Sequence, residues 1–261
     1  MSGSDEDADA DADPSRVLLL IAHGSRDPRH ATTVRALTRR IRSMRPGLRV
    51  STAFLDFEPP SVAAELALLA QHGARRVVAQ PLLLTQAFHA RTDLPRALRE
   101  APPALCVRQA DVLGPHALLT AALERRLAEA GLEPGDRAAT SVVLACAGTT
   151  DPRAVAALAA LAALAAQWRR TGWYDVRPAF ASGGALPGTR DAVRALRGAG
   201  ARRIAVAPYV LAPGRLPDRI ALGAAEGGAD VVGAVLGAAP ELARLVLRRY
   251  DATVRAPALT G

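Results

Sequence analysis

The chain has 261 residues, 50% of them hydrophobic, which is enough for one large or two small domains with an apolar core. No apolar run approaches the roughly 20 residues of a membrane span, and two cysteines without CxxC spacing, Cys106 and Cys146, argue against a disulfide framework or a cysteine-bound metal cluster. The net charge of +8 suits a polyanionic partner, whether nucleic acid, a phosphate or a polycarboxylate, or else a solvated helical surface. Only 3% of the residues are aromatic, which argues against binding of single-stranded nucleic acid.

Residues 1–14 carry six acidic residues and no basic one. A segment of this composition cannot bury apolar surface, so we expect a disordered acidic tail. A secretory signal would instead be basic and then apolar. We therefore expect a cytoplasmic protein with neither membrane nor nucleic acid among its partners.

Short apolar runs alternate with helical periodicity along the rest of the first half. Residues 17–22 form a continuous apolar run, typical of a strand buried on both faces. Asp27 and Pro28 then mark the start of an amphipathic helix, which Pro46-Gly47 ends. This alternation predicts an α/β fold with a doubly wound, mostly parallel sheet. Further strands are expected at 48–55, 76–84 and 105–108, and further helices at 62–71, capped by Ser61, and at 117–130.

The second half of the chain repeats the first at an offset of about 125 residues. Three stretches match earlier ones, which is more than chance similarity between alanine-rich segments would produce. Residues 143–153 match 19–29, residues 176–182 match 50–56, and residues 200–211 match 73–84. We therefore expect two tandem, related domains at 15–131 and 140–253, joined by a linker at 132–139 and followed by a tail at 254–261.

The second copy keeps the strands and turns of the first but loses its reactive side chains. At the matching positions His23 becomes Ala147, Asp56 becomes Ser182, Glu58 becomes Gly184 and His89 becomes Leu216. Side chains that serve packing would be expected in both copies. We therefore expect one active half and one scaffolding half in a monomer with a pseudo-twofold internal repeat, and an active site in the cleft between the halves.

Three consecutive strands carry the reactive side chains to one edge of the predicted sheet, where ligands bind in open α/β folds. His23 follows the first strand, Asp56 and Glu58 follow the second, and His89 follows the third. Two imidazoles and a carboxylate suit a divalent metal such as Fe²⁺, Co²⁺, Ni²⁺ or Zn²⁺, and an incomplete ligand set leaves positions open for exchange. The same groups could instead move protons.

Simpler interpretations of these residues are also open. A histidine after a strand is often only a hydrogen-bonded loop residue, and either Asp56 or Glu58 could cap the helix that follows. A strand-like backbone would point both carboxylates to the same side, so their spacing does not say which one functions. We assign no role to His30, His72 and His116, which lie in predicted helices or at helix ends.

The motifs around these residues are specific in combination. They are Ile21-Ala-His-Gly-Ser-Arg26, Phe54-Leu-Asp56 with Pro60-Ser61, and the run from Pro81 to Pro95 that contains His89-Ala-Arg-Thr-Asp93. Together they resemble the class II tetrapyrrole chelatases, the sirohydrochlorin cobaltochelatases and ferrochelatases. The similarity spans both halves and implies two tandem chelatase-like domains.

The resemblance implies an enzyme, a lyase-class chelatase that inserts Fe²⁺ or Co²⁺ into sirohydrochlorin and releases two protons, in siroheme or cobalamin biosynthesis. In that family two histidines and a glutamate bind the metal and assist its insertion. By this resemblance His23 and His89 are metal ligands and proton acceptors. Asp56 stands where the family commonly has glutamate, so either Asp56 or Glu58 is the carboxylate that acts with them.

The resemblance also implies which partners the site takes. The metal is a substrate, no cofactor is permanently bound, and ligand type does not discriminate between Fe, Co and Ni. A noncatalytic metal or tetrapyrrole carrier using the same two histidines is the alternative. Sirohydrochlorin bears eight carboxylates, so polar and basic neighbours of the histidines are candidates to bind it, namely Ser25, Arg26, Arg29 and Arg91.

Overall fold

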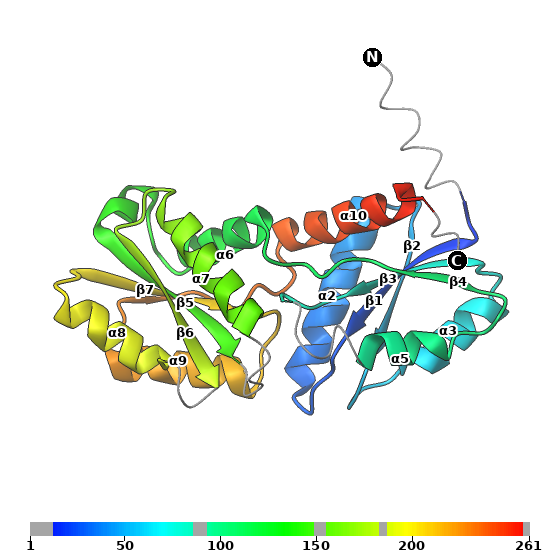
Figure 1. The fold of residues 1–261 in the computed structure, drawn as a ribbon, viewed down its shortest axis with the longest axis horizontal. Coiled ribbons are helices and arrows are strands. Elements are labelled where there is room, and N and C mark those ends of the chain that lie inside the picture. The colour runs from blue at the N-terminus through cyan, green and yellow to red at the C-terminus, as the bar shows by residue number, and fades with distance from the viewer. Residues whose placement is uncertain (1–12, 86–92, 149–154, 183–186, 258–261) are drawn as a thin grey trace, which may run out of the picture. The chain divides into compact units, whose positions relative to one another are not determined.

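The structure, a computed structural model, describes residues 13–85, 93–148, 155–182 and 187–257 (Figure 1). Within these ranges the chain forms two four-stranded sheets, each with helices packed against it. We describe each sheet by itself, beginning with the one that carries the predicted reactive residues.

The first sheet consists of β1 (Arg16–Ala22), β2 (Arg49–Phe54), β3 (Arg76–Pro81) and β4 (Cys106–Gln109). Its order is β2-β1-β3-β4, and every neighbouring pair is parallel. The central strand β1 is at most 2% exposed from Val17 to Ala22. The expectation of a strand buried on both faces is therefore confirmed.

The second sheet consists of β5 (Thr140–Gly148), β6 (Asp175–Ser182), β7 (Arg203–Tyr209) and β8 (Val231–Val232). Its order is β6-β5-β7-β8, again with parallel neighbours. The central strand precedes both of its neighbours in the chain, as in the first sheet. The shared order and direction confirm the expected α/β fold and its internal repeat.

The helices around the first sheet begin at the caps that the sequence indicates. Helix α2 (Pro28–Met44) starts after Asp27, whose side chain accepts the Arg29 amide, and α3 (Val62–Gln71) starts after Ser61, whose hydroxyl accepts the Ala64 amide. Short helix α5 (Asp93–Arg99) lies beside α3. Alternate residues of β1 pack against α3 and α5 through one apolar cluster that includes Val17, Leu19, Ile21, Leu66 and Leu94.

The remaining helices are the last helix of the first repeat and the helices of the second repeat. They are α6 (Ala117–Glu129), α7 (Val155–Arg169), α8 (Thr189–Gly198), α9 (Arg215–Gly227) and α10 (Pro240–Arg255). The expected linker at 132–139 is largely a 3₁₀ helix, η1 (Pro134–Ala139). Helix α10 continues to Arg255, beyond the expected domain end at 253.

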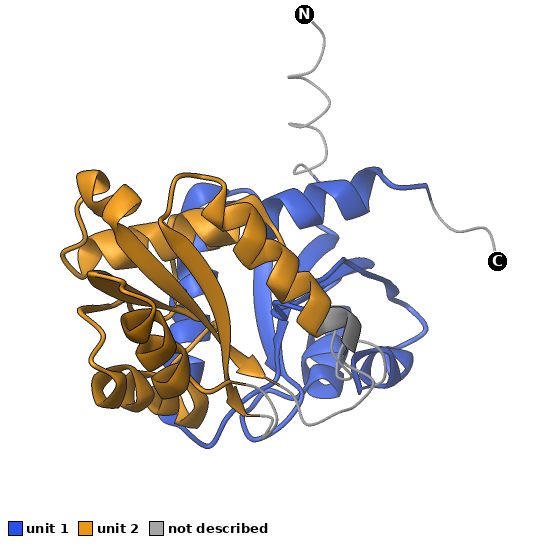
Figure 2. Cartoon of the chain, turned by 60° about the vertical axis from the view of Figure 1, so that its left-hand side comes forward, with its two compact units in different colours: residues 1–113, 243–261 blue, residues 114–242 orange. Residues whose placement is uncertain are grey.

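Packing divides the chain into two compact units that do not coincide with the two repeats (Figure 2). One unit comprises Met1–Leu113 with Ala243–Gly261, and the other comprises Gly114–Leu242. The reason lies in the last helix of each repeat. Helix α6 packs on β7, and α10 joins α2 through an Arg45–Asp251 ion pair of 2.6 Å.

The expected acidic tail lies mostly outside the described residues. Its last members are described, and Asp13 accepts hydrogen bonds from Ser15 and, at 2.9 Å, from the Arg76 guanidinium. Those bonds lower the pKa of the Asp13 carboxyl, and the bond from the Ser15 hydroxyl has the largest effect. Among the described helices, none combines the length and apolar character needed to cross a membrane.

Glycines at the ends of β1 and β5 show that the two repeats align residue by residue. Gly24 has a φ of 93° and Gly148 a φ of 79°. A Cβ on Gly24 would overlap the carbonyl oxygen of Asp56, and one on Gly148 would overlap that of Ser182. Each repeat thus brings its second strand so close to the end of its first that only glycine fits there.

We expect Gly24→Ala to destabilise the protein far more than Gly73→Ala, a matched control. Gly73 has a φ of 79° with nothing within 4 Å of the new Cβ, so only the backbone penalty of about 1–2 kcal/mol applies. Gly24→Ala adds steric overlap worth about 1–3 kcal/mol more. Urea unfolding of both variants measures the difference, and equal losses of stability would refute the close approach.

Candidate functional site

His23 directly follows β1, and the chain after β2 is hydrogen-bonded to it. The Leu55 amide donates to the Ala22 carbonyl at 2.9 Å, and the Asp56 amide donates to the His23 carbonyl at 2.9 Å. Parallel pairing therefore continues past the ends of both strands. As a result His23 and Asp56 are neighbours at the carboxyl edge of the sheet, as the strand order predicts.

A pocket of about 360 Å³ opens beside this pair. His23 and Asp56 form part of its wall, and Ser61, the N-cap of α3, also lines it. Helix α5 and the residue that follows it contribute two carboxylates and one guanidinium, Asp93, Glu100 and Arg96. The pocket thus combines an imidazole with carboxylates, which suits a cation more than an apolar ligand.

The two candidate carboxylates point to different surroundings because the backbone turns between them. Phe57 has a φ of 65°, and the Glu58 amide donates to the Asp56 carbonyl at 2.8 Å. The backbone over these residues is therefore not strand-like, so the two carboxylates do not have to point to the same side. Asp56 lines the pocket with His23, whereas the Glu58 carboxylate lies 3.8 Å from the Arg35 guanidinium of α2.

Phe57 contacts both Arg26 and His23. The Arg26 guanidinium carbon is 5.3 Å from the centroid of the Phe57 ring, which indicates a cation–π contact. The Phe57 and His23 rings meet edge to face, with centroids 6.2 Å apart. Arg26 and His23 therefore share a ring neighbour, Phe57, and the substrate-binding role of Arg26 stays a prediction.

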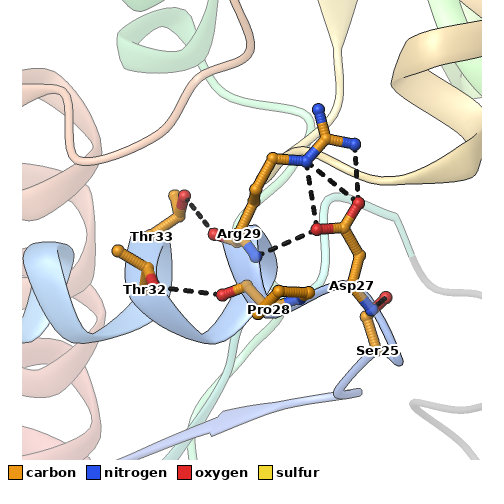
Figure 3. Close-up of polar contacts among 6 residues, drawn as sticks. All are labelled: Ser25, Asp27, Pro28, Arg29, Thr32 and Thr33. Carbon is orange, nitrogen blue, oxygen red and sulfur yellow. Dashed lines mark hydrogen bonds and ion pairs between the residues drawn. The ribbon is translucent and has the colours of Figure 1, made fainter.

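The other predicted substrate-binding residues near His23 already take part in the start of α2 (Figure 3). The Ser25 hydroxyl accepts the Asp27 amide at 3.1 Å. The Arg29 guanidinium donates to both oxygens of the Asp27 carboxylate, at 2.6 Å for the ion pair. The contacts with Arg29 lower the pKa of the Asp27 carboxyl, and the hydrogen bonds from the Arg29 side chain have the largest effect.

Two predicted site residues, His89 and Arg91, lie outside the described residues. His72 and His116, which were given no role, lie at helix ends, and the His116 Nδ1 accepts the Leu118 amide as the cap of α6. Among the described side chains, no group of three or more histidines, cysteines and carboxylates is arranged to hold a metal. His23 and Asp56 thus represent the described part of the predicted ligand set.

A model of the CbiX family matches the chain twice, over residues 17–130 and 141–253. The chain belongs to the CbiX family. The two matches agree with the two sheets and with the paired glycines that end β1 and β5. The resemblance to class II chelatases is therefore confirmed, and so is the tandem arrangement.

Named relatives of this CbiX family member are chelatases. A Priestia megaterium protein named sirohydrochlorin cobaltochelatase is 29% identical over 209 residues, covering 78% of this chain and 66% of that protein. Bacillus subtilis SirB with Fe³⁺ has the same fold, with a TM-score of 0.77, 19% identity, and coverage of 92% of this chain and 96% of SirB. The cobalt complex of SirB from Bacillus subtilis subspecies spizizenii gives a TM-score of 0.72 at 20% identity. The match covers 93% of this chain and 96% of that SirB chain.

The second CbiX repeat keeps the geometry of the site without its titratable side chains. Gly148 repeats the close approach of Gly24, and Ala147 and Ser182 stand at the positions of His23 and Asp56. The Ser182 hydroxyl donates to the Ala147 carbonyl at 2.8 Å, and Ala147 packs against the apolar core. The turn therefore persists for structural reasons, independently of metal chemistry.

His30, in the first turn of α2, is a neighbour of the site that helical position alone does not single out. Burial lowers its pKa, and the nearby His23 lowers it further, while Glu58 and Asp27 act in the opposite direction. Its ring centroid lies 6.4 Å from that of Phe54. The sequence could have indicated this position through the short loop between β1 and α2. A loop of that length keeps the first turn of the helix close to the end of the strand.

We expect His30 to make the folded state less stable in mild acid. An unfolded histidine binds a proton below about pH 6.5, whereas folded His30, with its lowered pKa, takes it up only at lower pH. The unfolded state therefore binds more protons there, so stability falls as the pH drops from about 6.5 towards the folded pKa. Replacing His30 by glutamine should reduce this fall.

Urea unfolding at about pH 7.5 and 5.5 measures the effect. The loss of stability between these two pH values should be smaller in His30→Gln than in wild type. His72→Gln, which removes an exposed histidine, serves as the control. Equal losses in wild type and His30→Gln would contradict the assignment.

Proposed function

We propose that this protein is a sirohydrochlorin chelatase that inserts Fe²⁺ or Co²⁺ into sirohydrochlorin and releases two pyrrole protons. Membership of the CbiX family supports this, as does the name of the Priestia megaterium relative. The SirB structures, with Fe³⁺ and with cobalt, support a metal substrate of this group. The metal is consumed in the reaction, so no permanently bound cofactor is needed.

The observation that carries the proposal is the pairing of His23 with Asp56. A backbone hydrogen bond of 2.9 Å holds the two residues together, and both line the same pocket. The second repeat has the same backbone but neither side chain. An imidazole and a carboxylate placed in this way are suitable ligands for a divalent cation.

Insertion exchanges two pyrrole protons for one dication, so the charge of the macrocycle does not change. We assign His23 to hold the ion through its neutral imidazole and then to accept a pyrrole proton. His89 has the same role by family resemblance. Asp56 is the carboxylate of the set rather than Glu58, because Asp56 lines the pocket while Glu58 faces Arg35.

Basic residues near His23 are proposed to bind the substrate carboxylates. Arg26 is assigned this role because its guanidinium contacts Phe57, whose ring also meets that of His23, and Arg91 has the same role by resemblance. Arg29 is 53% exposed but paired with Asp27, so a substrate carboxylate would compete with Asp27 for it. Ser25 supports the turn from which Arg26 and Arg29 project.

We also propose that the protein works as a monomer in the cytoplasm, without nucleic acid or membrane. One chain already contains both repeats that the family model recognises.

We expect His23→Ala to lower the metallation rate by at least about 100-fold, because general acid–base catalysis alone contributes 10²–10⁴-fold. His89→Ala should have the same effect. Anaerobic incubation of sirohydrochlorin with Fe²⁺ or Co²⁺, followed by absorbance, measures the rate. His72→Ala, which removes a histidine at the end of α3, should retain wild-type activity.

An unchanged metallation rate in His23→Ala would refute the role of this residue. If wild type binds sirohydrochlorin but metallates it no faster than the spontaneous reaction, the protein is a carrier and the chelatase proposal is wrong.

We expect the metallation rate to fall as the pH drops below about 6, since imidazoles then become protonated and can neither bind a cation nor accept a proton. A pH series of initial rates measures this. A rate that stays flat across that range would count against histidine ligands.

A further inference from the structure

Phe57 combines two features that are each uncommon. Its side chain is 49% exposed in a chain that is only 3% aromatic. Its φ of 65° also makes it the only non-glycine residue with a positive φ within the described ranges. This conformation disfavours a large L side chain, so the position would suit glycine or asparagine better on backbone grounds.

Neighbouring hydrogen bonds hold Phe57 in this conformation. The Phe57 amide donates to a carboxylate oxygen of Asp56 at 2.8 Å, and the Glu58 amide donates to the Asp56 carbonyl at 2.8 Å. Asp56, which lines the pocket, therefore also holds the backbone of Phe57. Since half of the side chain is exposed, burial does not explain why a phenylalanine occupies a strained position.

The surroundings of the ring indicate what it could bind. One ring partner is the Arg26 guanidinium, at 5.3 Å, and the ring also lies edge to face with His23, at 6.2 Å. An apolar flat surface, a cation and an imidazole thus lie within one small region. This combination fits a flat conjugated macrocycle with anionic groups at its rim, because the ring can stack while the guanidinium pairs with a carboxylate.

We propose that Phe57 is a substrate-binding residue that stacks against the tetrapyrrole and sets the position of the macrocycle relative to His23. The proposal rests on the proposed chelatase function and deepens it by assigning a macrocycle contact to an aromatic side chain. Arg26 pairs with a rim carboxylate of the same macrocycle. Asp56 then links both substrates, because it lines the metal pocket and holds the Phe57 backbone.

The test measures binding of metal-free sirohydrochlorin by absorbance titration, which separates macrocycle binding from metal chemistry. Leucine removes the flat stacking surface, so Phe57→Leu should raise the Kd roughly 10-fold. In metallation assays the KM for the macrocycle should rise by a similar factor, while the KM for the metal stays unchanged. Phe57→Tyr should restore wild-type values.

Phe57→Gly separates a binding role from a structural one. Glycine accepts the positive φ without strain, so this variant should unfold in urea at a denaturant concentration no lower than wild type. It should nevertheless bind the macrocycle at least as weakly as Phe57→Leu. Tyr174→Leu, which removes a 59% exposed aromatic ring from the second unit, is the matched control and should bind normally.

Wild-type affinity in Phe57→Leu would overturn this proposal, and so would loss of folding in Phe57→Gly. A loss of affinity of the same size in Tyr174→Leu would overturn it too. If wild type itself neither binds sirohydrochlorin nor metallates it, the proposed function fails instead, which the same titration shows directly.

Discussion

The candidate site depends on a close approach of two backbone segments at the carboxyl edge of the first sheet. The Asp56 amide is hydrogen-bonded to the His23 carbonyl, and the carbonyl of Asp56 lies where a side chain on Gly24 would have to be. This constraint sets which side chains can meet. It fixes an imidazole beside a carboxylate, starts the turn that exposes Phe57, and leaves no freedom for Gly24 to be replaced.

The second repeat separates what the fold requires from what the chemistry requires. Gly148 and Ser182 reproduce the close approach, and the Ser182 hydroxyl satisfies the Ala147 carbonyl. The turn is thus stable without a histidine or a carboxylate. Its persistence in a copy that lacks titratable groups indicates that the CbiX repeat is a stable scaffold on which reactive side chains can be added or lost.

The arginine content has a structural role that net charge conceals. Many guanidiniums pair with carboxylates of their own unit, as in Arg45–Asp251 and Arg125–Glu241, both at 2.6 Å. The second pair anchors a buried carboxylate, since the Glu241 side chain is only 7% exposed, and the Arg125 pKa is raised by that contact. The net charge therefore overstates how many guanidiniums are free of a carboxylate partner.

The sequence by itself determined the α/β fold and its duplication, because these follow from apolar runs, helical periodicity and matching stretches of the chain. It also predicted that His23 meets a carboxylate from the end of the second strand, without distinguishing Asp56 from Glu58. The tertiary structure decided which carboxylate lines the pocket, since that depends on the positive φ of Phe57. It also decided that His30 lies near His23. In addition, it decided that the last helix of each repeat belongs to the compact unit that contains the other repeat's sheet. Such features depend on contacts between segments distant in the chain, which periodicity and spacing do not encode.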